Sequence, residues 1–206
     1  MTSIITGDII SSREIKSPDI WMGPLKALFE QIGPYPAVWD IFRGDTFQLE
    51  IADPAEALGV ALRIKALVKS KAGVGARMAI GIGNKDYTSS RITESNGEAF
   101  ILSGDRYENL KKEKISLALE TPWNDINRQL NVSIRLALIA VDSWSRMSAE
   151  FINMRMNSPL LTQVQLAEKL GISQSSVSAR QKRAYYDEIM ELESLYREMI
   201  TQKLRS

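Results

Sequence analysis

Residues 3–11 read Ser-Ile-Ile-Thr-Gly-Asp-Ile-Ile-Ser, and this stretch decides how the first half of the chain is interpreted. β-Branched residues dominate the run and favour an extended backbone. The Gly-Asp pair inside it favours a turn, so we expect a strand that ends at a functional loop. A second Gly-Asp pair, Gly44-Asp45, joins two short apolar runs over 37–43 and 46–51 and predicts a hairpin.

The segments between and after these strands have apolar residues at helical spacing. The pattern predicts helices over 18–32, 54–70 and 96–112, and further strands over 76–82 and 115–119. The resulting order, β-α-β-β-α-β-α-β, is typical of an α+β fold. It predicts an antiparallel sheet with helices on one face, close to the ferredoxin-like arrangement.

The sequence after Thr121-Pro122 is helical throughout. Residues 123–157 carry one apolar stripe, which predicts a single long helix. Ser158-Pro159 ends this helix, and three helical segments follow it. We therefore divide the chain into an α+β domain over 1–121, a connector helix over 122–157 and an all-α helix-turn-helix domain over 158–206.

The helix-turn-helix prediction depends on residues 161–184, which read Leu-Thr-Gln-Val-Gln-Leu-Ala-Glu-Lys-Leu-Gly-Ile-Ser-Gln-Ser-Ser-Val-Ser-Ala-Arg-Gln-Lys-Arg-Ala. The small Ala167 allows two helices to approach, Gly171 permits a left-handed turn, and Ser173 suits the N-cap of the second helix. The shared apolar contacts would come from Leu166, Leu170, Ile172 and Val177.

The second of these helices would present polar side chains to base edges and cations to phosphates. Residues 162–183 carry four cations against one carboxylate, a net charge of +3. Double-stranded DNA is therefore the expected partner, although a helical hairpin that only packs or dimerises is the alternative. Arg180 stands where many such motifs have an apolar residue. The candidate DNA-binding residues are Ser173, Gln174, Ser175, Ser176, Ser178, Arg180, Lys182 and Arg183.

The last helical segment, residues 184–204, has an apolar stripe with little else to cover in its own domain. Such a face favours contact with a second chain, so we expect a homodimer that binds two half-sites on DNA. The stripe consists of Tyr185, Ile189, Leu192, Leu195, Tyr196 and Met199.

Composition limits the chemistry. The 206 residues include 26 Lys and Arg, 25 Asp and Glu, and neither His nor Cys. A disulfide framework, a thiolate nucleophile, a Ser-His triad and the usual zinc site are excluded, and no haem is expected. Gly81-Ile82-Gly83 lacks the spacing of a dinucleotide-binding loop. Any metal must be a hard cation held by carboxylates.

Asp8 and Asp45 are the candidate ligands, because both follow a glycine at the end of a predicted strand. Two converging carboxylates need a neutralising cation, and Mg²⁺ (or Mn²⁺) bridging nucleotide phosphates is the natural occupant. The alternative is that Arg13, Arg43 and Arg77 pair with these carboxylates and no metal binds. Two carboxylates within reach of one cation favour the metal site, and bidentate arginine pairs favour the alternative.

These motifs resemble those of class III nucleotidyl cyclases and, over nearly the whole chain, those of the SatD-like bacterial proteins. The resemblance is carried by the order of Thr6–Arg13, Arg43–Gln48, Arg77–Gly83, Gly97–Phe100 and the terminal helix-turn-helix. It implies a palm-like cyclase fold joined to a DNA-binding module. It also implies metal ligation by Asp8 and Asp45, with a nucleotide near Gly7, Ile9, Ile10, Arg13, Arg43 and Gly44.

The sequence departs from the active cyclases at Asn109, which is followed by Leu110, Lys111 and Lys112 where they carry an arginine one turn later. We therefore expect a DNA-binding regulator whose cyclase-like domain senses a nucleotide with Mg²⁺ without turning it over. The alternatives are a nucleotidyl cyclase with a DNA-binding appendage and a purely structural protein. The absence of Cys and of a targeting or membrane-spanning segment predicts a cytoplasmic location and no membrane partner.

Overall fold

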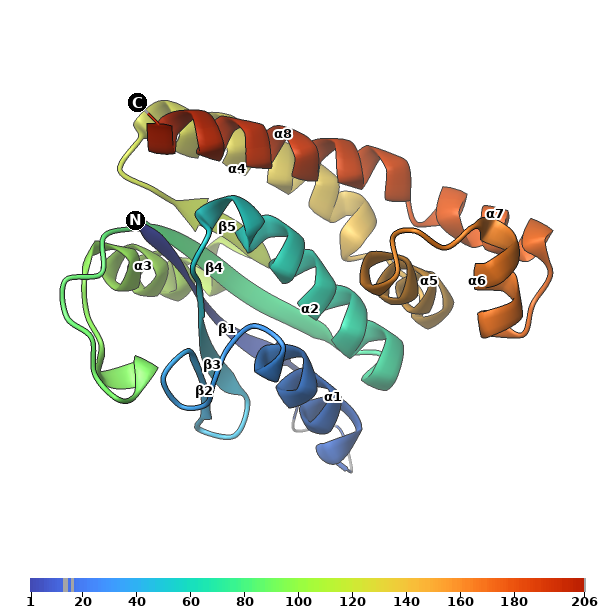
Figure 1. The fold of residues 1–206 in the computed structure, drawn as a ribbon, viewed down its shortest axis with the longest axis horizontal. Helices are drawn as coiled ribbons and strands as arrows, with labels where there is room; N and C mark the ends of the chain where they lie inside the picture. Colours follow the sequence, from blue (N-terminus) through green and yellow to red (C-terminus); the bar gives the residue numbers. More distant parts are fainter. Residues whose placement is uncertain (13–14, 16, 206) are drawn as a thin grey trace.

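The computed structural model describes every residue except 13, 14, 16 and 206. The described residues contain a five-stranded sheet with the strand order β2-β3-β1-β4-β5 (Figure 1). The central strand β1 pairs antiparallel with β3 and β4, whereas β5 runs parallel to β4. The α+β class is confirmed, but the expectation of a wholly antiparallel sheet is wrong at this edge. The strands are β1 (Thr2–Ile10), β2 (Trp39–Phe42), β3 (Thr46–Ile51), β4 (Gly75–Gly83) and β5 (Leu117–Glu120).

Helices cover both faces of the sheet. Helices α1 (Asp19–Glu30) and α2 (Ala57–Ala72) cover one face, on which Ile5 and Ile9 of β1 join the main core. Alternate residues of β1 point the other way, toward α3 (Glu98–Glu113), where the hydroxyls of Thr6 and Ser103 lie 3.0 Å apart. The expectation of helices on one face only is therefore wrong. The connection from β4 to the parallel β5 passes through α3, and this crossover covers the second face.

The predicted connector consists of two helices, α4 (Asn124–Val141) and α5 (Arg146–Asn157). The single-helix prediction is wrong because Ser145 starts a new helix, with its hydroxyl accepting a hydrogen bond from the Ser148 amide. Between them, buried Trp144 donates its indole N–H to the Ala184 carbonyl at 2.9 Å. Helix α4 packs on β5, and α5 packs on α2, so the connector is part of the main core.

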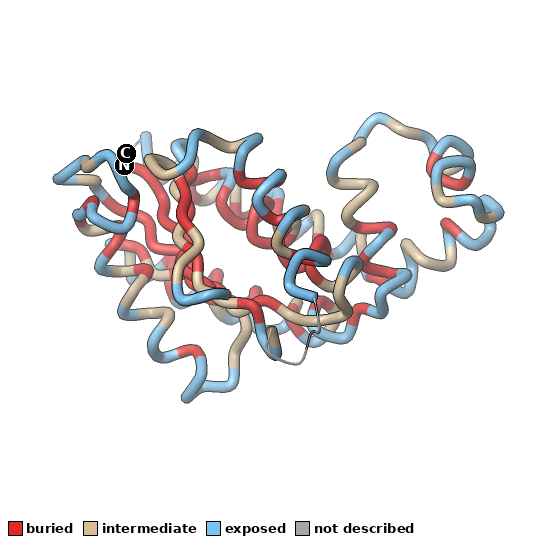
Figure 2. Tube along the Cα trace, turned by 90° about the horizontal axis from the view of Figure 1, so that it is seen from below, coloured by how far each residue is buried: buried red, intermediate tan, exposed pale blue. Residues whose placement is uncertain are grey.

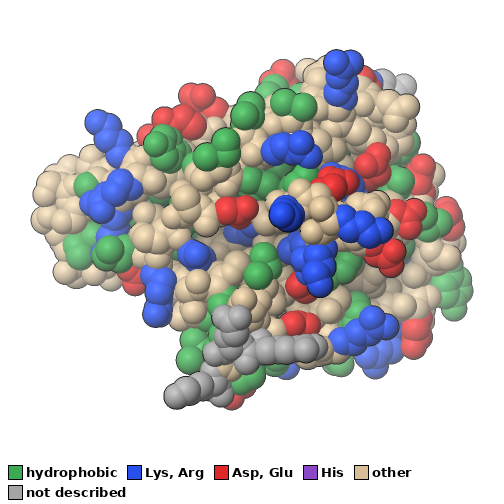
Figure 3. All heavy atoms as spheres, turned by 180° about the vertical axis from the view of Figure 1, so that it is seen from behind, with side chains coloured by type: hydrophobic (Ala, Val, Ile, Leu, Met, Phe, Trp, Pro, Cys, Tyr) green, Lys and Arg blue, Asp and Glu red, His purple; other side chains and the backbone are tan. Residues whose placement is uncertain are grey.

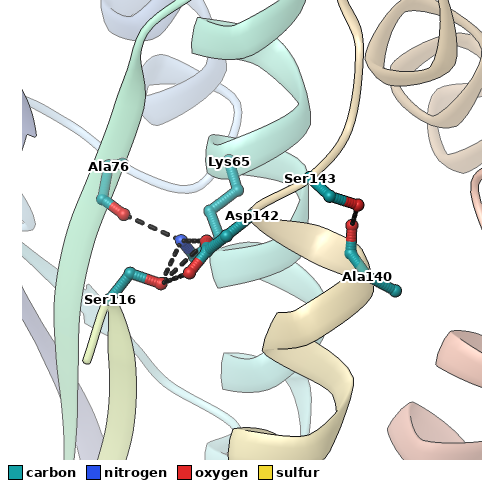
Figure 4. Close-up of polar contacts among 6 residues, drawn as sticks. All are labelled: Lys65, Ala76, Ser116, Ala140, Asp142 and Ser143. Atoms are coloured by element: carbon teal, nitrogen blue, oxygen red, sulfur yellow. Dashed lines mark hydrogen bonds and ion pairs between the residues drawn. The ribbon is translucent and has the colours of Figure 1, made fainter. Parts of the chain in front are cut away.

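A buried lysine fixes the end of α4. The ammonium of Lys65 on α2 donates to the Ala76 carbonyl at 2.9 Å, to the Ser116 hydroxyl at 2.8 Å and to the Asp142 carboxylate at 2.8 Å (Figure 4). Burial lowers the pKa of Lys65, and the Asp142 carboxylate partly offsets this shift. The network joins α2, the sheet and the C-terminus of α4.

Three more helices follow among the described residues: α6 (Gln163–Leu170), α7 (Gln174–Arg183) and α8 (Tyr186–Arg205). Helices α6 and α7 lie at one end beside α5, whereas α8 returns along α4 (Figure 1). The Tyr196 hydroxyl donates to the Pro54 carbonyl at 2.8 Å, in the short 3₁₀ helix Pro54–Glu56. Part of the apolar stripe predicted for dimerisation, Ile189 and Tyr196, is therefore buried within the chain.

Buried residues run through the sheet and the helices packed on it, whereas the end formed by α6 and α7 is mostly exposed (Figure 2). None of the described helices combines the length and the apolar character needed to cross a membrane.

Candidate nucleic-acid interface and metal site

The turn between α6 and α7 has the geometry that its residues predict. Helix α6 begins with a capping box between Thr162 and Gln165, and it ends at Gly171, whose φ of 64° is left-handed. The Ser173 hydroxyl then accepts a hydrogen bond from the Ser176 amide at 3.2 Å and caps α7. Val177 is fully buried between the two helices, in contact with a core that includes Leu166 and Ala167.

Most of the candidate DNA-binding side chains are exposed on α7. The hydroxyl of Ser173 lies 2.9 Å from those of Ser175 and Ser176, so three hydroxyls cluster at the first turn of the helix. Two cations, Lys182 and Arg183, lie at the other end. The exposed candidates are Ser173, Gln174, Ser175, Ser176, Ser178, Lys182 and Arg183.

Arg180 does not lie with them. Its side chain is 14% exposed and forms an ion pair with Glu150 of α5, with 2.8 Å between Nη1 and Oε2. Residue 180 follows Val177 by three positions and therefore shares its inward face. The expectation that Arg180 points outward is wrong, and its place at a commonly apolar position was the signal that could have shown this.

Asp8 is held by an arginine and a tyrosine. Arg77 is its partner on β4 and donates two hydrogen bonds, from Nε to Oδ1 and from Nη2 to Oδ2, both at 2.9 Å. The Tyr107 hydroxyl on α3 adds a bond to Oδ1 at 2.8 Å. Burial, together with the Asp8 carboxylate, raises the pKa of Tyr107 to about 12. The bidentate arginine already neutralises Asp8, as the alternative to a metal requires.

Tyr107 is not among the residues that the sequence motifs single out. Asp8 follows Thr6 by two strand positions, and Tyr107 follows Ser103 by four helix positions. Because Thr6 and Ser103 contact each other, the two periodicities place the next pair in contact as well. The signal was present, but it required the knowledge that α3 covers this face.

Asp45 has a different set of partners. Its carboxylate accepts from the Ser12 hydroxyl at 2.5 Å, and its carbonyl accepts from the Ile9 amide at 3.2 Å. Arg43 and Gly44 are exposed and both have positive φ, 53° and 90°, which form the hairpin turn. Among the described residues, the side-chain partners of Asp8 and those of Asp45 are different residues, and no group of three or more Asp and Glu is arranged to hold a metal ion.

The other residues expected near a nucleotide contribute mainly to the packing of the sheet. A Cβ atom on Gly7 would lie 2.7 Å from the Arg77 carbonyl and from the side chains of Met78 and Phe47, so only glycine fits between β3 and β4. Ile9 is buried in the core, and Ile10 is partly exposed at the strand end. Arg13 lies outside the described residues.

Comparisons of the chain with protein-family models, with curated proteins and with solved structures found no match.

Proposed function

We propose that the chain is a DNA-binding transcriptional regulator in which α6 and α7 form a helix-turn-helix. The observation that carries this proposal is the exposed surface of α7, with a hydroxyl cluster at its N-terminus and Lys182 and Arg183 at its C-terminal end. Hydroxyls and helix N-terminal amides suit phosphates and base edges, and the cations suit the phosphate backbone. Lys and Arg side chains are visible on the narrow end of the molecule (Figure 3).

The first half of the chain supports a cyclase-like domain of the SatD-like kind. The segment from β1 to β4 has the order β-α-β-β-α-β, with α1 and α2 on one face and β1 between β3 and β4. This is the connectivity of the ferredoxin-like and palm folds. The added α3 and β5 extend the sheet beyond that unit.

We propose that this domain does not transfer nucleotides in the arrangement described. Nucleotidyl transfer needs a metal-bound carboxylate pair, and Asp8 is neutralised by Arg77 instead. Binding of Mg²⁺ and a nucleotide at Asp8 and Asp45 requires Arg77 to leave Asp8 first. The enzyme alternative predicts pyrophosphate release from a nucleoside triphosphate that the Asp8→Asn change abolishes.

A second copy of the chain completes the proposal. Helices α4 and α8 enclose an apolar groove of about 750 Å³, and Val132, Leu136 and Ile139 on α4 are 59%, 64% and 74% exposed. The exposed face of α4 also carries Arg128 and Arg135, whereas the groove side of α8 carries Glu188 and Glu191.

A two-fold contact would place α4 of one copy against α8 of the other, so that arginines face glutamates and the apolar groove is covered. Such a dimer would present two copies of α7 to successive half-sites on DNA. Leu195 and Tyr185, which are exposed at this groove, then contact the second copy.

Selection of bound sequences from a random double-stranded DNA library tests the proposal, because it needs no knowledge of the operator. A regulator enriches a defined sequence, whereas a purely structural protein enriches none.

A further inference from the structure

A cavity of about 400 Å³ lies between α1, α2 and α5, and neither Gly-Asp pair lines it. This volume falls within the range of small-molecule sites in proteins. Its lining combines apolar and polar side chains, so the cavity can hold both the carbon skeleton and the polar group of a small ligand. Its lining includes Leu28, Gln31, Arg63, Leu67, Asn153 and Asn157.

Arg63 is the only charged residue that lines this cavity among the described residues. Its Nη2 donates to Asn157 Oδ1 at 2.6 Å and to Gln31 Oε1 at 3.5 Å, and both of these acceptors are neutral amides. Its Nε is buried and has no hydrogen-bond partner among the described residues. No described carboxylate forms an ion pair with this guanidinium. Burial lowers the pKa of Arg63.

A half-buried guanidinium without a counter-ion is a costly arrangement, because burial weakens its hydration and only neutral amide oxygens replace the lost water. Guanidinium groups bind carboxylates and phosphates through two parallel hydrogen bonds, and the free Nε can supply one of them. We propose that this cavity binds a small organic anion, a carboxylate or a phosphate ester, with Arg63 as its ionic contact.

The surrounding groups suit such a ligand. The Asn157 amide donates to Asn153 Oδ1 at 3.1 Å, which aligns two carboxamides beside Arg63. An adjoining polar hollow of about 290 Å³ shares these two asparagines and adds Lys71 as a second cation. Leu28 and Leu67 would contact the carbon skeleton.

The cavity is also connected to α7. Glu150, Asn153 and Asn157 are spaced by three and four residues, so they share one face of α5. Glu150 lines the adjoining hollow and forms the ion pair with Arg180 of α7. A ligand that orders Asn153 and Asn157 would fix α5 between α2 and α7 and change the affinity for DNA. This coupling rests on the proposed function, whereas the binding of the anion does not.

The binding test uses inorganic phosphate, glycerol 3-phosphate and succinate, each compared with chloride at equal ionic strength. We expect glycerol 3-phosphate or succinate to raise the melting temperature and to shift the NMR signal of the Arg63 Nε–H; which of the two does so identifies phosphate or carboxylate as the ligand chemistry. The Arg63→Ala variant should lose both effects, and Arg63→Lys, which keeps the charge without the planar fork, should bind about tenfold more weakly.

The matched control is Arg205→Ala, which removes one exposed arginine from the end of α8 and should bind like the native chain. The inference is overturned if none of the three anions, at about 10 mM, raises the melting temperature or shifts the Arg63 Nε–H signal, because the dissociation constant would then lie well above about 10 mM. It is also overturned if Arg63→Ala binds as the native chain does.

The coupling is measured separately, as the change in DNA affinity on addition of the anion that binds. If the anion binds but DNA does not, the proposed function fails and the site remains. If DNA binds and no anion does, the anion site fails and the proposed function remains. If both bind and are coupled, DNA must change the affinity for the anion by the same factor by which the anion changes the affinity for DNA. If neither ligand changes the affinity for the other, the coupling is refuted.

Discussion

Arg180 of α7 and Glu150 of α5 form an ion pair with 2.8 Å between Nη1 and Oε2. The pair separates the cations of α7 into two groups, because Arg180 points toward α5 whereas Lys182 and Arg183 remain exposed. One group supports the position of the helix, and the other is available to a partner.

The first prediction compares these groups. Arg180→Ala should lower the free energy of unfolding by about 1 kcal/mol, because it removes an ion pair and the packing of a mostly buried side chain. The Lys182→Ala/Arg183→Ala double variant should change stability by less than about 0.5 kcal/mol. Urea denaturation measures both. Equal losses would show that the three cations have the same structural role.

The second prediction concerns Asp8. Asp8→Asn should destabilise the fold by about 2 kcal/mol, because Arg77 loses a charged partner with two hydrogen bonds. Asp45→Asn is the matched control and should cost less, since its carboxylate accepts only from Ser12 among the described side chains. Mg²⁺ with a nucleoside triphosphate should leave the melting temperature of the native chain unchanged. A Mg²⁺-dependent increase that Asp8→Asn removes would reinstate the metal site.

The third prediction concerns the buried Lys65. Its side chain is 5% exposed, whereas that of Asp142 is 47% exposed. Asp142→Ala leaves a buried ammonium without its carboxylate and should cost about 2 kcal/mol, whereas Lys65→Met leaves Asp142 accessible to water and should cost less. Thermal and urea unfolding give the two values. The opposite order would mean that Lys65 stabilises the fold chiefly through its neutral acceptors, Ala76 and Ser116.

The fourth prediction concerns the second copy. The native chain should have the mass of a dimer in solution, and Leu136→Glu/Ile139→Glu should have the mass of a monomer with unchanged stability, since both side chains are exposed within one chain. Ile101→Glu, which places one such charge on an exposed isoleucine of α3, is the control. Light scattering after size exclusion measures the masses. A native monomer, or a dimer that survives the double change, contradicts the proposed contact.

Local sequence patterns were sufficient for most of the elements. The β-branched run of β1, the Gly44-Asp45 hairpin and the Gly171-Ser173 turn all depend on residues near in sequence, and the structure confirms each of them. The break between α4 and α5 was missed because Leu138, Val141 and Trp144 continue the apolar spacing through it. That break depends on the cap at Ser145 and on the contact of Asp142 with Lys65, which is distant in sequence.

The site residues divide in the same way. The N-cap Ser173 and the exposed α7 residues follow from helix periodicity. The partners of Asp8 do not, because Arg77 is placed by the strand register and Tyr107 by the face that α3 covers. The expectation that the first strand ends at a turn at Gly7-Asp8 is wrong, because both residues lie within β1 and pair with β3 and β4. Only Asp45 lies in a turn, and the partners of both carboxylates depend on tertiary contacts that the sequence pattern does not contain.

Selection from a random double-stranded DNA library at about 0.15 M salt is the most direct test of sequence-specific DNA binding, because non-specific contacts are largely screened there. A dimeric helix-turn-helix protein should enrich an inverted repeat, whose affinity falls at least about tenfold in Lys182→Ala/Arg183→Ala. No loss is expected in Lys111→Ala/Lys112→Ala, which removes an equally exposed pair of cations at the end of α3. The absence of any enriched sequence, or equal binding by the native chain and the α7 variant, would contradict the proposed function.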